Sequence, residues 1–339
     1  MKNTSPLLFM CLLSFAISCG EKEKEIVSVV SLAESEPLVT HVWKENSLAS
    51  YSKDLFVTDS HHFFLDALGD TLLRVYPKDD PMTLTSYALK EEGASMLQSL
   101  EFVKGNSRYP NSDKGLWLVN GKREFVELSY EASPVEILNR IPLPARAGRS
   151  FDYHLAEEEM YSVPSFGDEK TAFYFFHPDS GYYRVGMDDS TNQQYQRTRN
   201  AYLNNMKVNE SEATIVCAFR FFNRVVFYDM RGTIKQRITV GEEAIMPDNP
   251  NNTINMKEAT KCFIHLAATD QYVYCLYDGS TDYSAPSRIV IFDWKGNHHK
   301  TLQTDRSLKK IAVDPTDQYI LALTPSENNE GQEVVRYEL

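Results

Sequence analysis

The chain of 339 residues has one long apolar run, and that run lies at its N-terminus. It extends from Leu7 to Ile17 and is interrupted only by Ser14. A helix needs about 20 apolar residues to cross the hydrocarbon core of a bilayer, so this run is too short for a stable transmembrane segment. No other stretch of the sequence approaches that length, and we therefore expect no membrane-spanning helix.

Basic residues are scarce relative to acidic ones. Lys and Arg number 35 against 47 Asp and Glu, which gives a formal net charge of −12. Nucleic-acid binding needs a basic face, so the composition excludes nucleic acid as a partner. The same deficit argues against electrostatic docking on anionic lipid, so attachment to a membrane must depend on an apolar anchor.

Cysteine is also rare, with five in the chain. Cys11 lies inside the N-terminal apolar run, and Cys19 follows it directly. The remaining three, Cys217, Cys262 and Cys275, are an odd number without close spacing, and a chain of this length needs no disulfide framework. A predicted turn at residues 269–271 places Cys262 opposite a residue near 279 rather than opposite Cys275. This register favours free buried thiols, although the sequence leaves that pairing open.

The first eighteen residues have the layout of a secretory signal: a short segment with Lys2, the apolar run, and small side chains before Cys19. Residues 16–19, Ala-Ile-Ser-Cys, resemble the lipobox of bacterial lipoproteins. In that family the cysteine is acylated and becomes the new N-terminus. The resemblance implies that residues 1–18 are removed and that Cys19 carries lipid. The alternative is an ordinary cleaved signal followed by a chance cysteine.

A charged run, residues 20–25, follows the cysteine and is typical of a solvated tether. It resembles the surface-export signals of lipoproteins in some Gram-negative lineages. Gly20 stands where an aspartate would favour retention in the inner membrane. The resemblance therefore implies an outer-membrane lipoprotein of the cell envelope, with exposure at the cell surface left open.

Helical periodicity is nearly absent, and only Glu91–Leu100 and Gln193–Asn205 are candidates for short helices. Short apolar or alternating runs recur instead, separated by clusters of Asp, Asn, Gly and Pro. The 19 Tyr and 18 Phe residues also fit strands. The sequence therefore predicts an all-β fold.

The recurring unit has two strands joined by a turn, often followed by a third strand. The six predicted units cover residues 62–76, 115–130, 171–185, 213–240, 272–302 and 309–339. Their anchoring apolar strands begin near residues 63, 116, 172, 214, 272 and 319, a spacing of about 51 residues that is typical of propeller blades. This period predicts a six-bladed β-propeller.

Two of the units share one hairpin pattern, at residues 226–232 and 290–296: two apolar residues, an aromatic residue, Asp, any residue, a basic residue and Gly. The aspartate is expected to cap the turn and the glycine to take a positive φ, which is turn chemistry rather than an active site.

A propeller must close its ring, and residues 334–339 are predicted to be the third strand of the last blade. We predict that residues 25–31 supply its fourth strand, because that pairing would cover an open edge. The chain then divides into a signal peptide at 1–18, a lipidated tether with the closing strand at 19–35, and the propeller at 36–339.

The C-terminal region has the strand Tyr272–Tyr277, then the turn at Ile291–Gly296, and then the segment Ile311–Asp314. In this order they resemble the TolB-like six-bladed propeller lipoproteins. It implies the propeller fold and a location in the cell envelope, and it brings no established catalytic residues. Many members carry a Gly-Pro loop after the first blade, and residues 90–97 lack that pattern, so no ligand at that loop is implied.

No catalytic, metal or cofactor site is predicted. His61-His62 and His298-His299 are adjacent pairs, and neighbours on a strand point to opposite faces, so neither pair suits one ion. Residues 188–192 come nearest to a calcium loop but offer too few spaced oxygens. Asn205 and Asn209 are candidates to face a central channel, whose inner positions otherwise read as apolar or small, as at Leu266–Ala268 and Ile311–Val313. No nucleophile elbow or phosphate loop is present.

Two basic loop segments are candidate ligand contacts at the mouth of the propeller. The residues concerned are Arg146, Arg149, Arg197, Arg199 and Tyr202, and they suit an acidic or sugar ligand. We therefore predict a binding or interaction module for a glycan, a peptide or an envelope protein. The alternative is an envelope hydrolase or lyase with a metal in the central channel, which carboxylates or asparagines facing that channel would favour.

Overall fold

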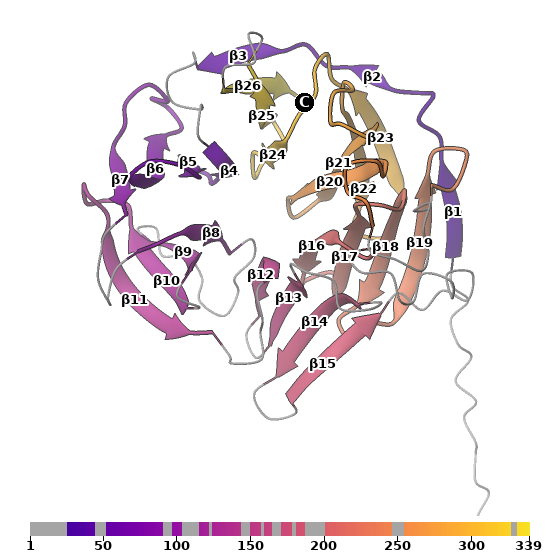
Figure 1. The fold of residues 1–339 in the computed structure, drawn as a ribbon, viewed down its shortest axis with the longest axis horizontal. Helices are drawn as coiled ribbons and strands as arrows, with labels where there is room; N and C mark the ends of the chain where they lie inside the picture. The colour runs from indigo at the N-terminus through magenta and orange to yellow at the C-terminus, as the bar shows by residue number, and fades with distance from the viewer. Residues whose placement is uncertain are drawn as a thin grey trace, which may run out of the picture.

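The structure is a computed structural model. It describes residues 26–44, 52–90, 97–103, 115–121, 124–143, 150–156, 159–164, 171–177, 181–186, 201–245, 254–326 and 331–339. In these ranges the regular elements are strands, grouped in six sheets of four or five strands around a common centre (Figure 1). The prediction of an all-β, six-bladed propeller is confirmed. Within the same ranges no helix is long and apolar enough to cross a membrane.

The first three blades each contain four strands. Blade 1 has β4 (Ser52–Val57), β5 (His61–Asp66), β6 (Thr71–Pro77) and β7 (Ser86–Leu89). Blade 2 has β8 (Leu100–Phe102), β9 (Gly115–Asn120), β10 (Glu124–Ser129) and β11 (Glu136–Pro142). Blade 3 has β12 (Ser150–Leu155), β13 (Met160–Pro164), β14 (Thr171–His177) and β15 (Gly181–Gly186).

The last three blades each gain a strand from the N-terminal segment. Blade 4 has β16 (Asn204–Asn209), β17 (Thr214–Phe219), β18 (Arg224–Asp229) and β19 (Ile234–Val240), with β1 (Ile26–Val30) outermost. Blade 5 has β20 (Lys261–Ala268), β21 (Tyr272–Ser280), β22 (Arg288–Asp293) and β23 (His298–Gln303), with β2 (Glu36–Pro37) outermost. Blade 6 has β24 (Lys310–Val313), β25 (Tyr319–Pro325) and β26 (Gln332–Glu338), with β3 (His41–Lys44) outermost.

The ring is closed by an N-terminal strand, but not by residues 25–31. The closing strand is β3, which pairs antiparallel with β26. Residues 26–30 form β1 instead, which pairs parallel with β19 at the rim of blade 4. Figure 1 shows β1, β2 and β3 following the rim past three successive blades. The alternating pattern of 25–31 marked a strand correctly, but it does not specify which of the three open edges that strand covers.

The expected short helices do not form where the structure describes them. Leu100 begins β8, and Asn204 and Asn205 begin β16. Residues 91–96 and 193–200 lie outside the described ranges. Pairing along the inner edge of a blade therefore prevails over weak helical periodicity at these positions.

The predicted hairpin turns form as expected. Asp229 Oδ1 accepts hydrogen bonds from the backbone nitrogens of Arg231 and Thr233, both at 2.8 Å. Gly232 has a φ of +85°, and a Cβ there would clash with the side chain of Val185. Asp293 makes the same bonds in blade 5, and Gly296 has a φ of +82°. These turns are structural.

The inner strand of each blade lines a central channel. These strands are β4, β8, β12, β16, β20 and β24, and each stands at the edge of its sheet. We call the end where they begin the amino end, and the end where they finish the carboxyl end. Neighbouring strands within a blade alternate in direction, so β19 runs from the carboxyl end to the amino end. Its parallel neighbour β1 therefore starts at the carboxyl end.

Candidate functional site at the amino end of the channel

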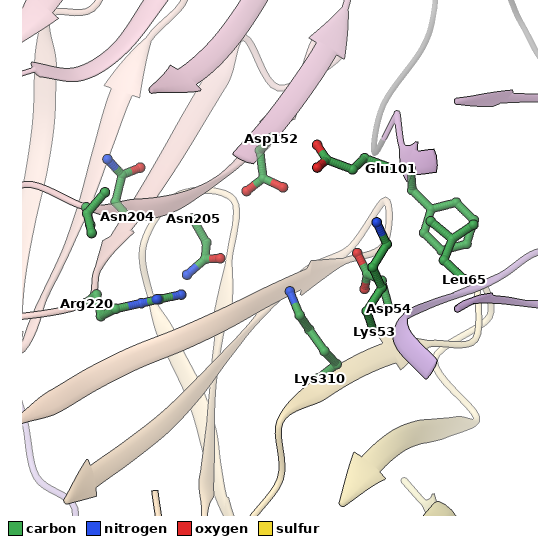
Figure 2. Close-up of a pocket in the computed structure, with 11 residues that line it drawn as sticks. Lys53, Asp54, Leu65, Glu101, Asp152, Asn204, Asn205, Arg220 and Lys310 are labelled. Carbon is green, nitrogen blue, oxygen red and sulfur yellow. The ribbon is translucent and has the colours of Figure 1, made fainter. Parts of the chain in front are cut away.

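A polar cavity of about 140 Å³ opens at the amino end of the channel. Figure 2 shows charged and amide side chains from several blades pointing into it. Its charged and amide lining is Lys53, Asp54, Glu101, Asp152, Asn204, Asn205, Arg220 and Lys310. Most of these residues lie in the first half of an inner strand, so six-fold closure of the ring brings distant parts of the sequence to one mouth.

The three carboxylates at this mouth are already engaged. Asp152 is buried, and its Oδ2 accepts a hydrogen bond of 3.1 Å from the backbone nitrogen of Met206 in the next blade. Asp54 Oδ1 accepts one of 3.0 Å from the nitrogen of Leu55. Glu101 and Lys310 also have interaction partners. The Asp152–Met206 bond links the inner strands of blades 3 and 4 at the mouth.

Two cationic side chains at the mouth, unlike the carboxylates, have no partner among the described residues. Neither the ammonium of Lys53 nor the guanidinium of Arg220 forms a hydrogen bond or an ion pair within the described part of the chain. The backbone of Arg220 is nevertheless fixed, because its nitrogen donates to Leu203 O at 2.7 Å and its carbonyl accepts from Cys262 N at 2.7 Å. The mouth therefore presents positive charge that the fold itself does not use.

Asn204 adds an uncommitted acceptor to the wall. Its Nδ2 donates to the carbonyls of Ala172 at 2.7 Å and Tyr202 at 2.9 Å. Its buried Oδ1 has no hydrogen-bond partner among the described residues. Buried polar atoms are usually satisfied, so this solvent-shielded oxygen is an exception among the polar atoms of the wall.

His265 lies beside this mouth, next to Asp54. Its Nδ1 accepts a hydrogen bond of 3.3 Å from the nitrogen of Ile311, which leaves Nε2 facing Asp54 Oδ1 at 3.9 Å. His265 is 2% exposed. Asp54 lines the amino-end cavity, whereas His265 lines a different cavity at the carboxyl end.

Of the five ligand contacts predicted from the sequence, the structure describes Tyr202. Arg146, Arg149, Arg197 and Arg199 lie outside the described residues, as do Cys19 and the segment 188–192. Tyr202 is only 3% exposed, and its ring stacks on Phe222 at a centroid distance of 5.6 Å. It is therefore a core residue and presents no surface to a ligand, because an aromatic ring gains more from packing than from exposure here.

The two asparagines proposed for the channel do line it, but at opposite ends. Asn205 lies at the amino-end mouth and Asn209 at the carboxyl end. Of the histidine pairs, His62 is buried and bonds to Tyr319, whereas His298 is exposed and lies 2.9 Å from Thr301 Oγ1. Cys217, Cys262 and Cys275 are free and buried.

Most of the mouth residues were missed from the sequence. The periodic signal follows the apolar second strands, such as β5 and β9, which are buried on both faces. The inner strands are short and polar where they begin, so Asp54, Glu101 and Asp152 look like loop residues. The apolar triplets expected to line the channel, Leu266–Ala268 and Ile311–Val313, do so only at the carboxyl end.

The lining has no metal-ligand set. Among the residues that the structure describes, no group of three or more His, Cys, Asp or Glu side chains is close enough to hold a metal ion. The carboxylates of the mouth are separated by cations and amides, a lining that suits a polar organic ligand.

Comparisons with known proteins show the fold. No protein-family model matches the chain, and no curated protein matches it in sequence. A crystal structure of a member of the DUF4221 family from Bacteroides vulgatus aligns over 90% of this chain and 98% of that chain, with 9% identity and a TM-score of 0.60. A Bacteroides fragilis protein named as an exported protein aligns over 92% of this chain and 98% of that one, with 8% identity and a TM-score of 0.55.

A luciferin-regenerating enzyme shares the same architecture, with a TM-score of 0.53 and 9% identity over 89% of this chain and 95% of that chain. At such low identities the likeness extends to the fold and not to the site, because one fold hosts many unrelated functions. The chain is therefore similar in fold to these proteins, and its fold is a six-bladed β-propeller.

Proposed function

We propose that this chain is an exported lipoprotein, anchored through Cys19, whose propeller binds an anionic polar ligand at the amino-end mouth. The observation that carries the binding proposal is the pair of uncommitted cations, Lys53 and Arg220, at a mouth whose carboxylates are engaged. A binding site gains affinity when charges that the fold leaves unpaired meet a ligand of opposite sign.

The volume of the amino-end cavity limits how large a ligand group it can enclose. Pockets that enclose a whole small molecule measure about 300–1,000 Å³, whereas this cavity measures about 140 Å³. It suits one charged group of a larger ligand, such as the uronate unit of a glycan or a carboxylate of a peptide. The rest of that ligand would lie across the amino-end face.

The strands that the two arginine-bearing segments connect support this proposal. Residues 144–149 join the end of β11 to the start of β12, and residues 187–200 join β15 to the residues before β16. Inner strands start at the amino end, so the described residues that flank both segments lie on the face of the mouth. We propose that Arg146, Arg149, Arg197 and Arg199 extend the cationic surface there.

The direction of β1 indicates which face of the propeller the proposed lipid anchor would hold towards the membrane. Only six residues lie between Cys19 and Ile26, and the seven extended steps from Cys19 to Ile26 span at most about 25 Å. Since β1 starts at the carboxyl end, the membrane would approach that face and the mouth would open away from it. The exported relative of similar fold supports an envelope location, and Gly20 after the cysteine favours the outer membrane.

The resemblance to TolB-like lipoproteins belongs to the same proposal. It is supported by the shared propeller and by the turn and strand motifs of the last two blades. The alternative is an envelope hydrolase or lyase. It is favoured by the three carboxylates that line one cavity, Asp54, Glu101 and Asp152. Paired carboxylates are the usual acid–base groups of glycan cleavage.

Thermal melting of the chain that starts at Gly20 distinguishes the two. This chain keeps every described strand, because β1 begins at Ile26. A ligand at about 100 times its Kd stabilises the fold by about 2.7 kcal/mol. The panel contains acidic glycans, acidic peptides and divalent ions. If the binding-module proposal is correct, an acidic ligand alone raises the midpoint of thermal melting. A shift that needs calcium and is lost with a chelator would support the enzyme instead.

A further inference from the structure

A second cavity opens at the opposite, carboxyl end of the channel. It measures about 420 Å³, which lies inside the range of pockets that hold small organic molecules. None of the described residues lines both this cavity and the amino-end mouth. The second halves of the inner strands supply its walls, so the two ends of one channel differ in both size and chemistry.

The walls of this cavity are mainly apolar. Val57 of β4, Leu266 and Ala267 of β20, and Ile311 and Val313 of β24 line it. The indole of Trp294 completes one side, and its Nε1 donates a hydrogen bond of 3.0 Å to Thr269 O, which fixes the ring. Apolar walls of this kind favour the hydrocarbon part of a ligand.

The rim of the cavity carries negative charge. Asp270 is exposed, and its carboxylate forms no hydrogen bond or ion pair with the described residues. Its backbone is held by Asn209 Nδ2, which donates to its carbonyl at 3.5 Å. Glu210 lies 2.9 Å from His154 Nε2 and also lines the cavity.

The one lysine among the described residues of this lining, Lys207, has an interaction partner of its own. Among the described residues, the unpaired charge at the carboxyl end is therefore negative, whereas the unpaired charge at the amino end is positive.

We propose that the carboxyl-end cavity binds a small organic ammonium ion. Its apolar body would lie against the walls of β20 and β24, and its ammonium group would meet Asp270 and Glu210 at the rim, with Trp294 able to add a cation–π contact. This site is independent of the function proposed above, because it uses none of the residues of the amino-end mouth.

Calorimetric titration tests the site with three probes of similar shape: hexylammonium, hexanol and hexanoate. The chain starting at Gly20 should bind hexylammonium more tightly than hexanol and should reject hexanoate. Asp270→Asn, at an exposed position, should weaken hexylammonium binding by roughly three- to fivefold. Ala267→Phe should fill the cavity and abolish binding of all three probes.

Asp79→Asn is the matched control, because it removes an exposed carboxylate from the outer turn between β6 and β7 on the same face. It should leave hexylammonium binding unchanged. Equal affinity for hexylammonium and hexanol, or an unchanged affinity in Asp270→Asn, would overturn the proposal. So would failure of hexylammonium to bind the unmodified chain. Because Asp270 is exposed, its replacement tests the site even if Ala267→Phe does not fold.

Discussion

His62 Nε2 and the Tyr319 hydroxyl lie 2.7 Å apart across the junction of blades 1 and 6, where the propeller ring closes. Both side chains are 1% exposed. Trp43 of the closing strand packs edge-on against His62 at a centroid distance of 5.1 Å, and the Arg336 guanidinium lies 3.9 Å from the centre of the Tyr319 ring. The seam therefore combines a buried hydrogen bond with aromatic and cation–π packing.

Tyr319→Phe should destabilise the propeller by about 1–2 kcal/mol, because it removes the hydroxyl and leaves a buried imidazole nitrogen without that partner. Urea denaturation at pH 7.5 measures the change in the free energy of unfolding. Tyr183→Phe is a suitable control, because Tyr183 is 40% exposed on β15, and it should change stability by less than about 0.5 kcal/mol. Equal stability of Tyr319→Phe and the unmodified chain would contradict the assigned seam.

The same histidine makes stability depend on pH. Burial, reinforced by Lys78 and Arg336, lowers the pKa of His62 from 6.5 to about 4. Below pH 6.5 the unfolded chain binds a proton that the folded chain refuses, so stability is full above pH 6.5 and falls as pH drops towards 4. The loss from this group is about 3 kcal/mol at most. His62→Gln should flatten this part of the stability profile, and an unchanged slope would refute the role given to His62.

The three thiols should be inert in the folded chain. Burial raises the pKa of the Cys262 thiol to about 12 and raises the pKa values of the Cys217 and Cys275 thiols as well. Because the thiolate is the reactive form, Ellman's reagent at pH 8 should detect no thiol in the native chain that starts at Gly20. The same sample in guanidinium, without reductant, should show all three. Detection of only one would mean that a disulfide had formed.

The prediction from sequence succeeded where a strand is buried on both faces and failed where it is not. The strands Tyr272–Tyr277 and Val290–Phe292 are continuous apolar runs, which the sequence shows directly. The turns Asp229–Gly232 and Asp293–Gly296, which share one pattern, predict hairpins. The inner strand β8 has only three residues, one of them Glu101, and gives no periodic signal. The mouth is assembled by closure of the ring, which brings Asp54 and Asn205 to one cavity although they are far apart in the sequence and no local pattern links them.

The orientation proposed at the membrane can be measured with two single-cysteine labels on the lipidated chain in vesicles. Asp70→Cys places a fluorophore in the amino-end turn between β5 and β6, and Asp79→Cys places one in a carboxyl-end turn. The buried native thiols should not react. A quencher carried by the lipids should quench the label at 79 more strongly than the label at 70. Stronger quenching at position 70 would reverse the orientation, and loss of vesicle binding is expected in Cys19→Ala.

The central claim is that the amino-end mouth recognises negative charge through Lys53 and Arg220. Calorimetric titration with glucuronate, glucose and glucosamine tests it most directly, because the three sugars have similar size and differ in charge. We predict that glucuronate binds most tightly, that glucosamine binds least, and that Arg220→Gln weakens glucuronate binding by about tenfold. Equal binding of the three sugars, no binding of glucuronate, or an Arg220→Gln chain that binds glucuronate as well as the unmodified chain would contradict the account.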